Sequence, residues 1–484
     1  MSLKTTAIKS FNWTALEMIF SQGTIFLTGI ILARLLTPKD FGVIGIMTVF
    51  IAVSNSIVEG GFSSALIRKK DTNNIDYTTV FYTNLAVGII LYVTLFVSSQ
   101  HIAIFFELPI LEKVLKYAGI ILVINAFSII QKTILTKLLN FKTQAIISIC
   151  SAVISGVVSI FLAFEGAGLW SLVILSISKP FLNSLFLWLQ TKWRPTLDFS
   201  KKSFTELFDY GYKLLLAGLI NTIYKNIYYI LIGKFFSPSS LGYYTRAEQF
   251  QHPVANNLTS TIRRISFPIL SLLQDDTIKL RASFIKFLRF TVYLNFTIMI
   301  TIAATAKPVI VLLIGEKWST SIYYLQLLCI PGMLYPLQII HLNLLLVKGY
   351  SKTNLQLEII KKIILLPLVI GTALISIEAM LYGLVLFSVI EYFINSYYTK
   401  RLINYSIIDQ FQDILPFLII SLIMFSVMIG ITFIELSLVQ MLIIQLISGG
   451  FSFIIINELF QLNEYLELKS RIKNAFKGIT RKYS

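Results

Sequence analysis

The chain has 484 residues, of which 56% are hydrophobic and only 13% charged, and its mean hydropathy is +0.77. Soluble domains usually carry about 25% charged residues, so this composition excludes an ordinary soluble fold. The formal net charge of +17 by itself would also fit a nucleic-acid-binding protein, but most of the 41 Lys and Arg residues fall on alternate loops between apolar runs. That distribution indicates an oriented membrane protein and no nucleic-acid partner.

Fourteen apolar runs are long enough to cross a bilayer, since a spanning helix needs roughly 20 mostly apolar residues. The first six lie at residues 11–36, 41–67, 78–97, 111–130, 145–164 and 169–189. After a basic linker, six more lie at residues 212–236, 241–273, 284–314, 322–347, 355–375 and 380–398. Two further runs lie at residues 414–434 and 439–456. We predict an all-α polytopic membrane protein with fourteen transmembrane helices.

The basic loops set the predicted orientation. They include Arg68 to Lys70, Arg263 and Arg264, and a group formed by Lys348, Lys352, Lys361 and Lys362. By the positive-inside rule, these loops and both termini are cytoplasmic. Residues 461–484 place Tyr465, Leu468, Ile472, Phe476 and Ile479 at helical spacing among Lys and Arg. We interpret this tail as an interfacial helix, and a disordered basic tail is the alternative.

A repeated stretch orders the chain. Residues 32–42 read LARLLTPKDFG, and residues 232–242 read IGKFFSPSSLG. Each copy ends an apolar run near a cation, makes a Ser/Thr-Pro turn, and starts another run at Gly. We infer a duplication that gives an N-lobe (residues 1–195) and a C-lobe (residues 196–405), followed by the extra helices (residues 406–460). Because six is even, the lobes are predicted to be parallel repeats, with a substrate site between them.

Several polar residues fall inside predicted spans, where a charge costs from about 2.5 to over 10 kcal/mol unless it faces a partner or water. Lys225 lies midway along the seventh run, and Asn221 precedes it by one turn. The eighth run repeats polar residues at helical spacing, and so does the second, its repeat mate. The stripe of the eighth run consists of Arg246, Gln249, His252, Asn256 and Ser260. The stripe of the second run consists of Thr48, Asn55, Glu59 and Ser63.

We predict from these stripes a hydrated cavity lined by cations and amides, which suits an anionic, sugar-bearing head group. The predicted substrate-binding residues are Lys225, Arg246, Lys179, Asn221, Gln249, Asn256 and Asn55. The candidates for ion coupling are Glu17, Glu59, Glu391 and His252. Each has a simpler alternative: Glu17 reaching the interface, His252 in an interhelical hydrogen bond, or Glu391 paired with a lysine. Cys150 and Cys329 lie alone, so no metal site or cofactor is predicted.

Residues 232–238 (IGKFFSP) and 241–247 (LGYYTRA) resemble the signature of Wzx-type polysaccharide flippases of the MOP superfamily. Further matches are residues 166–172 (GAGLWSL), 193–195 (WRP), 267–271 (FPILS) and 315–318 (GEKW). The resemblance implies a two-lobed, V-shaped, MATE-like bundle in the bacterial cytoplasmic membrane. It would move an undecaprenyl-pyrophosphate-linked oligosaccharide to the outer leaflet for surface polysaccharide, O-antigen or lipopolysaccharide synthesis.

By position, the resemblance points to Lys225 and Arg246 as the cations that engage the pyrophosphate. Relatives often carry an acidic residue midway along the seventh helix, where this chain reads Tyr224-Lys225-Asn226. Carboxylate-centred ion coupling on that helix is therefore not expected here.

We expect a transporter that works by alternating access and needs no covalent chemistry, driven by a proton or sodium gradient. The expected partners are the lipid-linked oligosaccharide, membrane lipids and the polysaccharide polymerase machinery. One alternative is a MATE-like exporter of cations or drugs, which would need carboxylates to dominate the cavity. The other is a membrane enzyme such as a polysaccharide polymerase or ligase. That alternative needs a large outer loop or clustered His, Arg and Asp, and every predicted outer loop is short.

Overall fold

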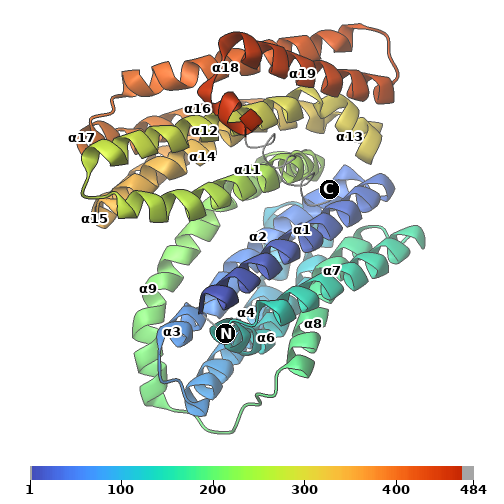
Figure 1. Cartoon of the computed structure of the whole chain (residues 1–484). Coiled ribbons are helices and arrows are strands. Elements are labelled where there is room, and N and C mark those ends of the chain that lie inside the picture. The colour runs from blue at the N-terminus through green and yellow to red at the C-terminus, as the bar shows by residue number, and fades with distance from the viewer. Residues whose placement is uncertain (1–2, 471–484) are drawn as a thin grey trace, which may run out of the picture. The chain divides into compact units, whose positions relative to one another are not determined.

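The computed structural model describes residues 3–470, and the side chains of residues 12–470. Every regular element in this part of the chain is a helix (Figure 1). The helices of the N-terminal part are α1 (Leu3–Leu35), α2 (Pro38–Glu59), α3 (Phe62–Arg68), α4 (Asn74–Phe105), α5 (Pro109–Ala118), α6 (Ile120–Lys137), α7 (Phe141–Phe164), α8 (Leu169–Gln190), α9 (Lys201–Lys225) and α10 (Ile227–Phe235). Those that follow are α11 (Pro238–Leu272), α12 (Thr277–Ala304), α13 (Ala306–Ile314), η1 (Glu316–Trp318), α14 (Thr320–Val347), α15 (Ser351–Ala373), α16 (Ile377–Ser396), α17 (Thr399–Ile403), α18 (Ile407–Gly430), η2 (Ile431–Phe433) and α19 (Leu438–Phe460).

Each of the fourteen predicted runs contains a helix, which confirms an all-helical, multi-pass membrane protein. In the described part, 11 helical segments are long and apolar enough to cross a membrane, or 12 if the bent pair α9 and α10 is one span. Two of the predicted spans, α11 and α15, are not among these segments. The polar stripe of α11 lowers its hydropathy, so the fourteen spans are confirmed only as helices.

Four of the predicted runs are broken into two helices. Between α2 and α3, Gly60 and Gly61 take positive φ angles of 54° and 70°, which residues with a Cβ rarely adopt. The pair α5 and α6 divides at Gly119, and the pair α12 and α13 at Thr305. Between α9 and α10 the axis bends by 41° at Asn226, whose side-chain amide donates to the Thr222 carbonyl at 2.8 Å. The bend places Lys225 at a helix end, whereas the sequence predicted it within a continuous helix.

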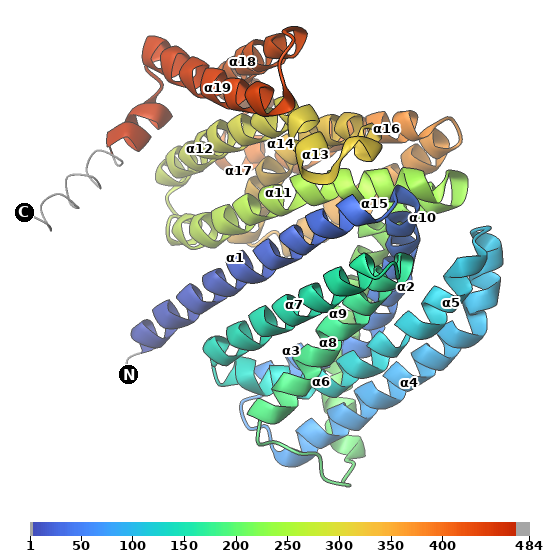
Figure 2. The ribbon, with the colours of Figure 1, turned by 90° about the vertical axis from the view of Figure 1, so that its right-hand side faces the viewer.

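The helices form two compact units, residues 1–245 and 246–484, which divide within α11. In the first unit α1 packs on α7, α7 on α8, α4 on α6, and α9 on α2 and α3. In the second unit α12 packs on α14 and α18, α14 on α16, and α18 on α19 (Figures 1 and 2). The lobe boundaries predicted from the repeat remain a prediction.

Residues 463–470 are helical, and the rest of the predicted tail helix, with Ile472, Phe476 and Ile479, lies outside the described residues.

At one end of the first unit, a buried apolar cluster joins α3, α4, α6 and α9. Its residues are Phe62, Ala65, Leu66, Val80, Phe81, Ile130 and Leu207. Beside it, Lys69 Nζ makes ion pairs with Asp76 at 3.1 Å and Glu206 at 3.0 Å. Burial alone would lower the pKa of Lys69, but hydrogen bonds to Glu206 and Asp76 outweigh it and raise that pKa. The basic loop after α3 is therefore fixed to α4 and α9.

The repeated stretch forms a contact with itself. In each copy a hydroxyl residue caps a helix whose first residue is proline: Thr37 accepts from the Asp40 amide, and Ser237 from the Ser240 amide. Gly42 lies against Pro238, and Gly242 lies against Pro38. A Cβ atom at Gly42 would lie 1.7 Å from the Pro238 carbonyl oxygen, and one at Gly242 would lie 1.9 Å from that of Pro38. The starts of α2 and α11 thus cross at a distance that only glycine allows.

Candidate functional site

The first unit contains a cavity of about 340 Å³ among α1, α2, α6, α7 and α8, which we call the polar cavity because half of its lining residues are polar. Its polar lining residues are Thr28, Thr48, Asn55, Asn125, Ser155, Ser176 and Lys179. The Asn125 side-chain amide donates to the Asn55 side-chain oxygen at 3.0 Å, which links α6 to α2. The sequence predicted Asn55 and Lys179 as substrate-binding residues, and the structure brings both to this cavity.

Lys179 is the cation of this cavity. It lies half-buried on α8, just before Pro180, whose ring nitrogen cannot donate and leaves the Ser176 carbonyl without its helical partner. Among the described residues it has no ion-pair partner within 4 Å, although Glu17 of α1 attracts it electrostatically. The described lining includes no Asp or Glu. A lysine amid hydroxyls and amides can bind an anionic group that also carries hydroxyls.

Lys225 and Asn221 lie near the C-terminal end of α9 in the first unit, and both are exposed. No hydrogen bond or ion pair within the described part occupies either side chain. A cation at a helix C-terminus is stabilised by the unpaired carbonyls of the last turn. The bend at Asn226 therefore lowers the cost of a lysine within an apolar segment.

In the second unit, α11 separates its polar residues onto two faces. Gln251, Ala255 and Thr259 are buried, and Gln251 packs on Gly332 of α14. The predicted stripe lies on the less buried side: Arg246, Gln249 and Asn256 are half-buried, and His252 is exposed. The Asn256 amide and the His252 ring form a hydrogen bond of 3.0 Å. That bond lies within one helix, whereas the alternative raised for His252 was a bond between helices.

Of the predicted coupling residues, Glu391 has the most enclosed surroundings. Lys361 Nζ of α15 makes an ion pair of 3.1 Å with Glu391 of α16 and a second, shorter one with Glu358. Lys361 is only 4% exposed and lies within α15, so its prediction as a loop cation is wrong. The i, i+3 spacing of Glu358 and Lys361 is a sequence signal that could have indicated the Glu358–Lys361 ion pair. Glu59, in contrast, is exposed at the last turn of α2.

Residues 31–323 match the family described as polysaccharide biosynthesis protein. The chain belongs to the polysaccharide biosynthesis protein family. Its similarity to lipopolysaccharide biosynthesis protein WzxC of Escherichia coli is 26% identity over 81% of this chain and 80% of that one. The chain is also similar to teichuronic acid biosynthesis protein TuaB of Bacillus subtilis, with 26% identity over 75% of this chain and 76% of that one. Succinoglycan biosynthesis transport protein ExoT of Rhizobium meliloti matches at 23% over 68% and 67%. The predicted resemblance is confirmed.

Solved structures show the fold of this family member. The lipid II flippase MurJ, in an inward closed conformation, superposes with a TM-score of 0.74 at 17% identity, covering 94% of this chain and 98% of that one. An inward-facing multidrug resistance MATE family transporter of the MOP superfamily superposes with a TM-score of 0.60 at 13% identity, covering 82% of this chain and 99% of that one. The MOP-type fold that the resemblance implied is therefore confirmed.

Proposed function

We propose that this protein carries a phosphate-linked, sugar-bearing lipid across the bacterial cytoplasmic membrane for surface polysaccharide synthesis. In this proposal an undecaprenyl-pyrophosphate-linked oligosaccharide moves from the cytoplasmic to the outer leaflet. The observation that carries the proposal is the polar cavity around Lys179 in a chain of this family. Its lysine suits phosphate, and its hydroxyls and amides suit sugar.

In the proposed mechanism, polar side chains that bind the head group are exposed first to one side of the membrane and then to the other. Lys179, Asn55, Asn221 and Lys225 would serve in the first unit, and Arg246, Gln249 and Asn256 in the second. The head group then passes along polar side chains while the hydrocarbon tail stays in lipid, which avoids burying phosphate and sugar in hydrocarbon. Fourteen spans, with α11 and α15 included, and two cytoplasmic termini are part of this proposal.

No covalent step is needed, so we propose a transporter and no enzyme. The names of two similar proteins support this: one is a transport protein of succinoglycan biosynthesis, and one is a lipid II flippase. A proton or sodium gradient is the proposed driving force, with Glu17, Glu59, Glu391 and His252 as candidate coupling residues. Polysaccharide polymerase machinery is a proposed partner.

The MATE-like fold raises a second candidate, export of an organic cation. Such a cargo needs carboxylates where it binds, because a lysine repels it. In the described part of the first unit, the cavity lining presents Lys179 and no acidic residue. The charge of that lining favours an anionic cargo.

The test replaces Lys225 and Arg246 by Ala, singly and together, in a host that lacks its own flippase of this kind. Membrane abundance is measured alongside surface polysaccharide and lipid-linked intermediate. We expect less polysaccharide and an accumulated intermediate at unchanged abundance. The matched control is Lys113→Ala, which removes an exposed cation on α5 outside the proposed set. Undiminished polysaccharide in the double variant would remove both residues from the proposal.

A further inference from the structure

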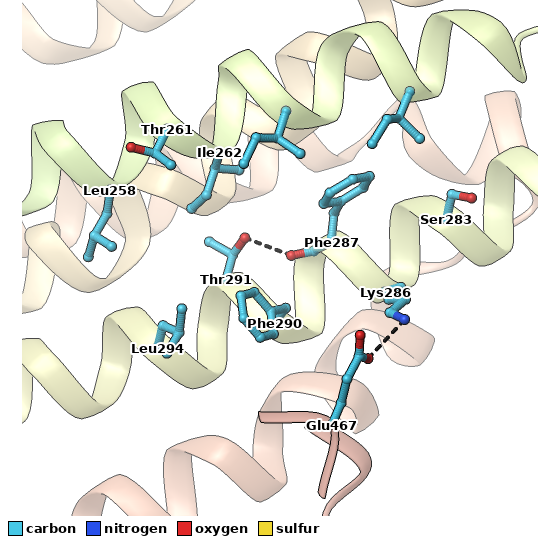
Figure 3. A pocket seen from close by; sticks show the side chains of 12 residues that line it. Leu258, Thr261, Ile262, Ser283, Lys286, Phe287, Phe290, Thr291, Leu294 and Glu467 are labelled. Atoms are coloured by element: carbon cyan, nitrogen blue, oxygen red, sulfur yellow. Dashed lines mark hydrogen bonds and ion pairs between the residues drawn. The ribbon is translucent and has the colours of Figure 1, made fainter. Parts of the chain in front are cut away.

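The second unit contains a second cavity, of about 510 Å³, between α11 and α12 (Figure 3). Its size lies in the range of about 300 to 1,000 Å³ that is typical of sites for small ligands. The residues that line it are mostly apolar: Leu258, Ile262, Ile265, Ile269, Phe287, Phe290 and Leu294, with Thr261, Ser283, Thr291, Lys286 and Glu467.

The two threonines add no free polar group to this wall. Thr261 Oγ1 donates to the Asn257 carbonyl at 2.8 Å, and Thr291 Oγ1 donates to the Phe287 carbonyl at 2.6 Å. Ile265 and Ile269 on α11 are 51% and 40% exposed. Because α12 is apolar enough to span the membrane, hydrocarbon is the medium that fits such a groove.

One end of the groove is charged. Figure 3 shows Lys286 and Glu467 facing each other there, while Leu258 and Leu294 lie at the other end. The Lys286 Nζ atom lies 2.9 Å from Glu467 Oε2. The Lys286 side chain is 69% exposed, so its ammonium is accessible. Glu467 belongs to the helical segment after α19, which Arg289 of α12 also holds through Glu464 at 2.6 Å. Basic pockets between transmembrane helices at the cytoplasmic side bind lipid phosphates.

We propose that this groove binds the hydrocarbon chain of a phosphate-bearing isoprenoid lipid, whose phosphate takes the place of Glu467 at Lys286. The lining presents one apolar groove and one accessible cation, Lys286, which matches a lipid with one hydrocarbon chain for its phosphate, whereas a phospholipid brings two chains. This inference rests on the proposed function, because the carrier lipid of the cargo is such an isoprenoid. It assigns the tail to α11 and α12, and it makes Glu467 a competitor of the phosphate for Lys286.

The binding test uses the purified full chain in phosphatidylcholine nanodiscs and a photoreactive prenyl phosphate that carries no sugar. We expect crosslinks on peptides of α11 and α12. Ile265→Trp should fill the groove and reduce these crosslinks severalfold. Its matched control is Leu272→Trp, also on α11 but 86% exposed and away from the lining. Crosslinks that persist in Ile265→Trp, or that phosphatidylglycerol displaces as well as unlabelled prenyl phosphate does, would overturn the assignment.

The charged end is tested with two further variants. Lys286→Gln should weaken prenyl phosphate binding roughly threefold, the size expected for one exposed charge pair. Glu467→Gln should strengthen it by a similar factor, because the competitor is gone. Weaker binding in Glu467→Gln would mean that the carboxylate helps to form the site, contrary to the proposal.

These results are separable from the test of transport. A probe without sugar reports on the groove whether or not the chain moves a cargo. If Lys225 and Arg246 prove necessary for polysaccharide while the probe fails to label α11 and α12, the groove assignment fails and the proposed function stands. If the probe labels the groove while those two residues prove dispensable, the groove assignment stands and Lys225 and Arg246 lose their proposed role in transport.

Discussion

Two lysines inside the helical units have opposite surroundings. Lys361 in the second unit is almost fully buried and is neutralised by Glu358 and Glu391. Lys179 in the first unit lines a cavity with hydroxyls and amides and has no carboxylate within ion-pair distance among the described residues. Since both positions are expensive for a charge, something must compensate each one.

The difference separates a structural charge from a functional one. Carboxylates of the protein compensate Lys361, so it can connect α15 to α16 without any ligand. Lys179 has only the attraction of Glu17 and the polar cavity, so in the proposed function a bound anion would be the partner that completes its surroundings. We therefore expect mutation of Lys361 and mutation of Lys179 to have opposite effects on stability and transport.

The largest expected effect is on stability. Lys361→Met would leave Glu391 enclosed without its cation, and breaking a buried pair in this way costs about 3–5 kcal/mol. We expect a lower unfolding temperature in detergent and reduced membrane abundance. The double variant Lys361→Met with Glu391→Gln should recover most of the loss, because the enclosed carboxylate is then neutral and the remaining Glu358 side chain is 37% exposed to its surroundings. A single variant as stable as the wild type would remove the structural role.

We expect Lys179→Met to reduce transport and not stability, the opposite of what we expect for Lys361→Met. It removes a charge that has no carboxylate beside it, so unfolding temperature and abundance should stay the same or rise. Transport should fall about tenfold or more, as expected for losing a charge-assisted hydrogen bond to phosphate of about 1.5–3 kcal/mol. Accumulated lipid-linked intermediate is the measurement, and Lys179→Arg, which keeps the charge, is the control. Normal transport in Lys179→Met would end the contrast between the two lysines.

The smallest effect is expected at Glu17. Removing a weak, partly screened attraction changes the energy of its partner by about 0.2–1 kcal/mol, so Glu17→Gln should change transport by less than about fivefold. The change should disappear when Lys179 is already Met, which a double-mutant cycle of transport rates would measure. If Glu17→Gln has the same effect in both backgrounds, Glu17 acts independently of Lys179.

Helix positions could be predicted from the sequence because apolar runs are the dominant signal of a membrane protein. Partners could not. Lys361 was interpreted as a loop cation because the positive-inside rule counts charges near run ends, and only packing shows that Glu391 lies beside it. The sequence marks Asn55 and Lys179 as polar groups in apolar runs, but their common cavity depends on the packing of α2 against α8. The apolar groove between α11 and α12 left no distinct pattern, since its isoleucines look like any other membrane-facing residues.

The repeated stretch predicted a duplication, and the structure adds that the two copies touch. Gly42 meets the Pro238 carbonyl, and Gly242 meets that of Pro38. Equivalent residues that exchange the same contact in both directions form an isologous interface, the kind that joins identical subunits about a two-fold axis. If the two copies are repeats, as the sequence predicts, separate half-length chains would meet through this same contact as a symmetric homodimer.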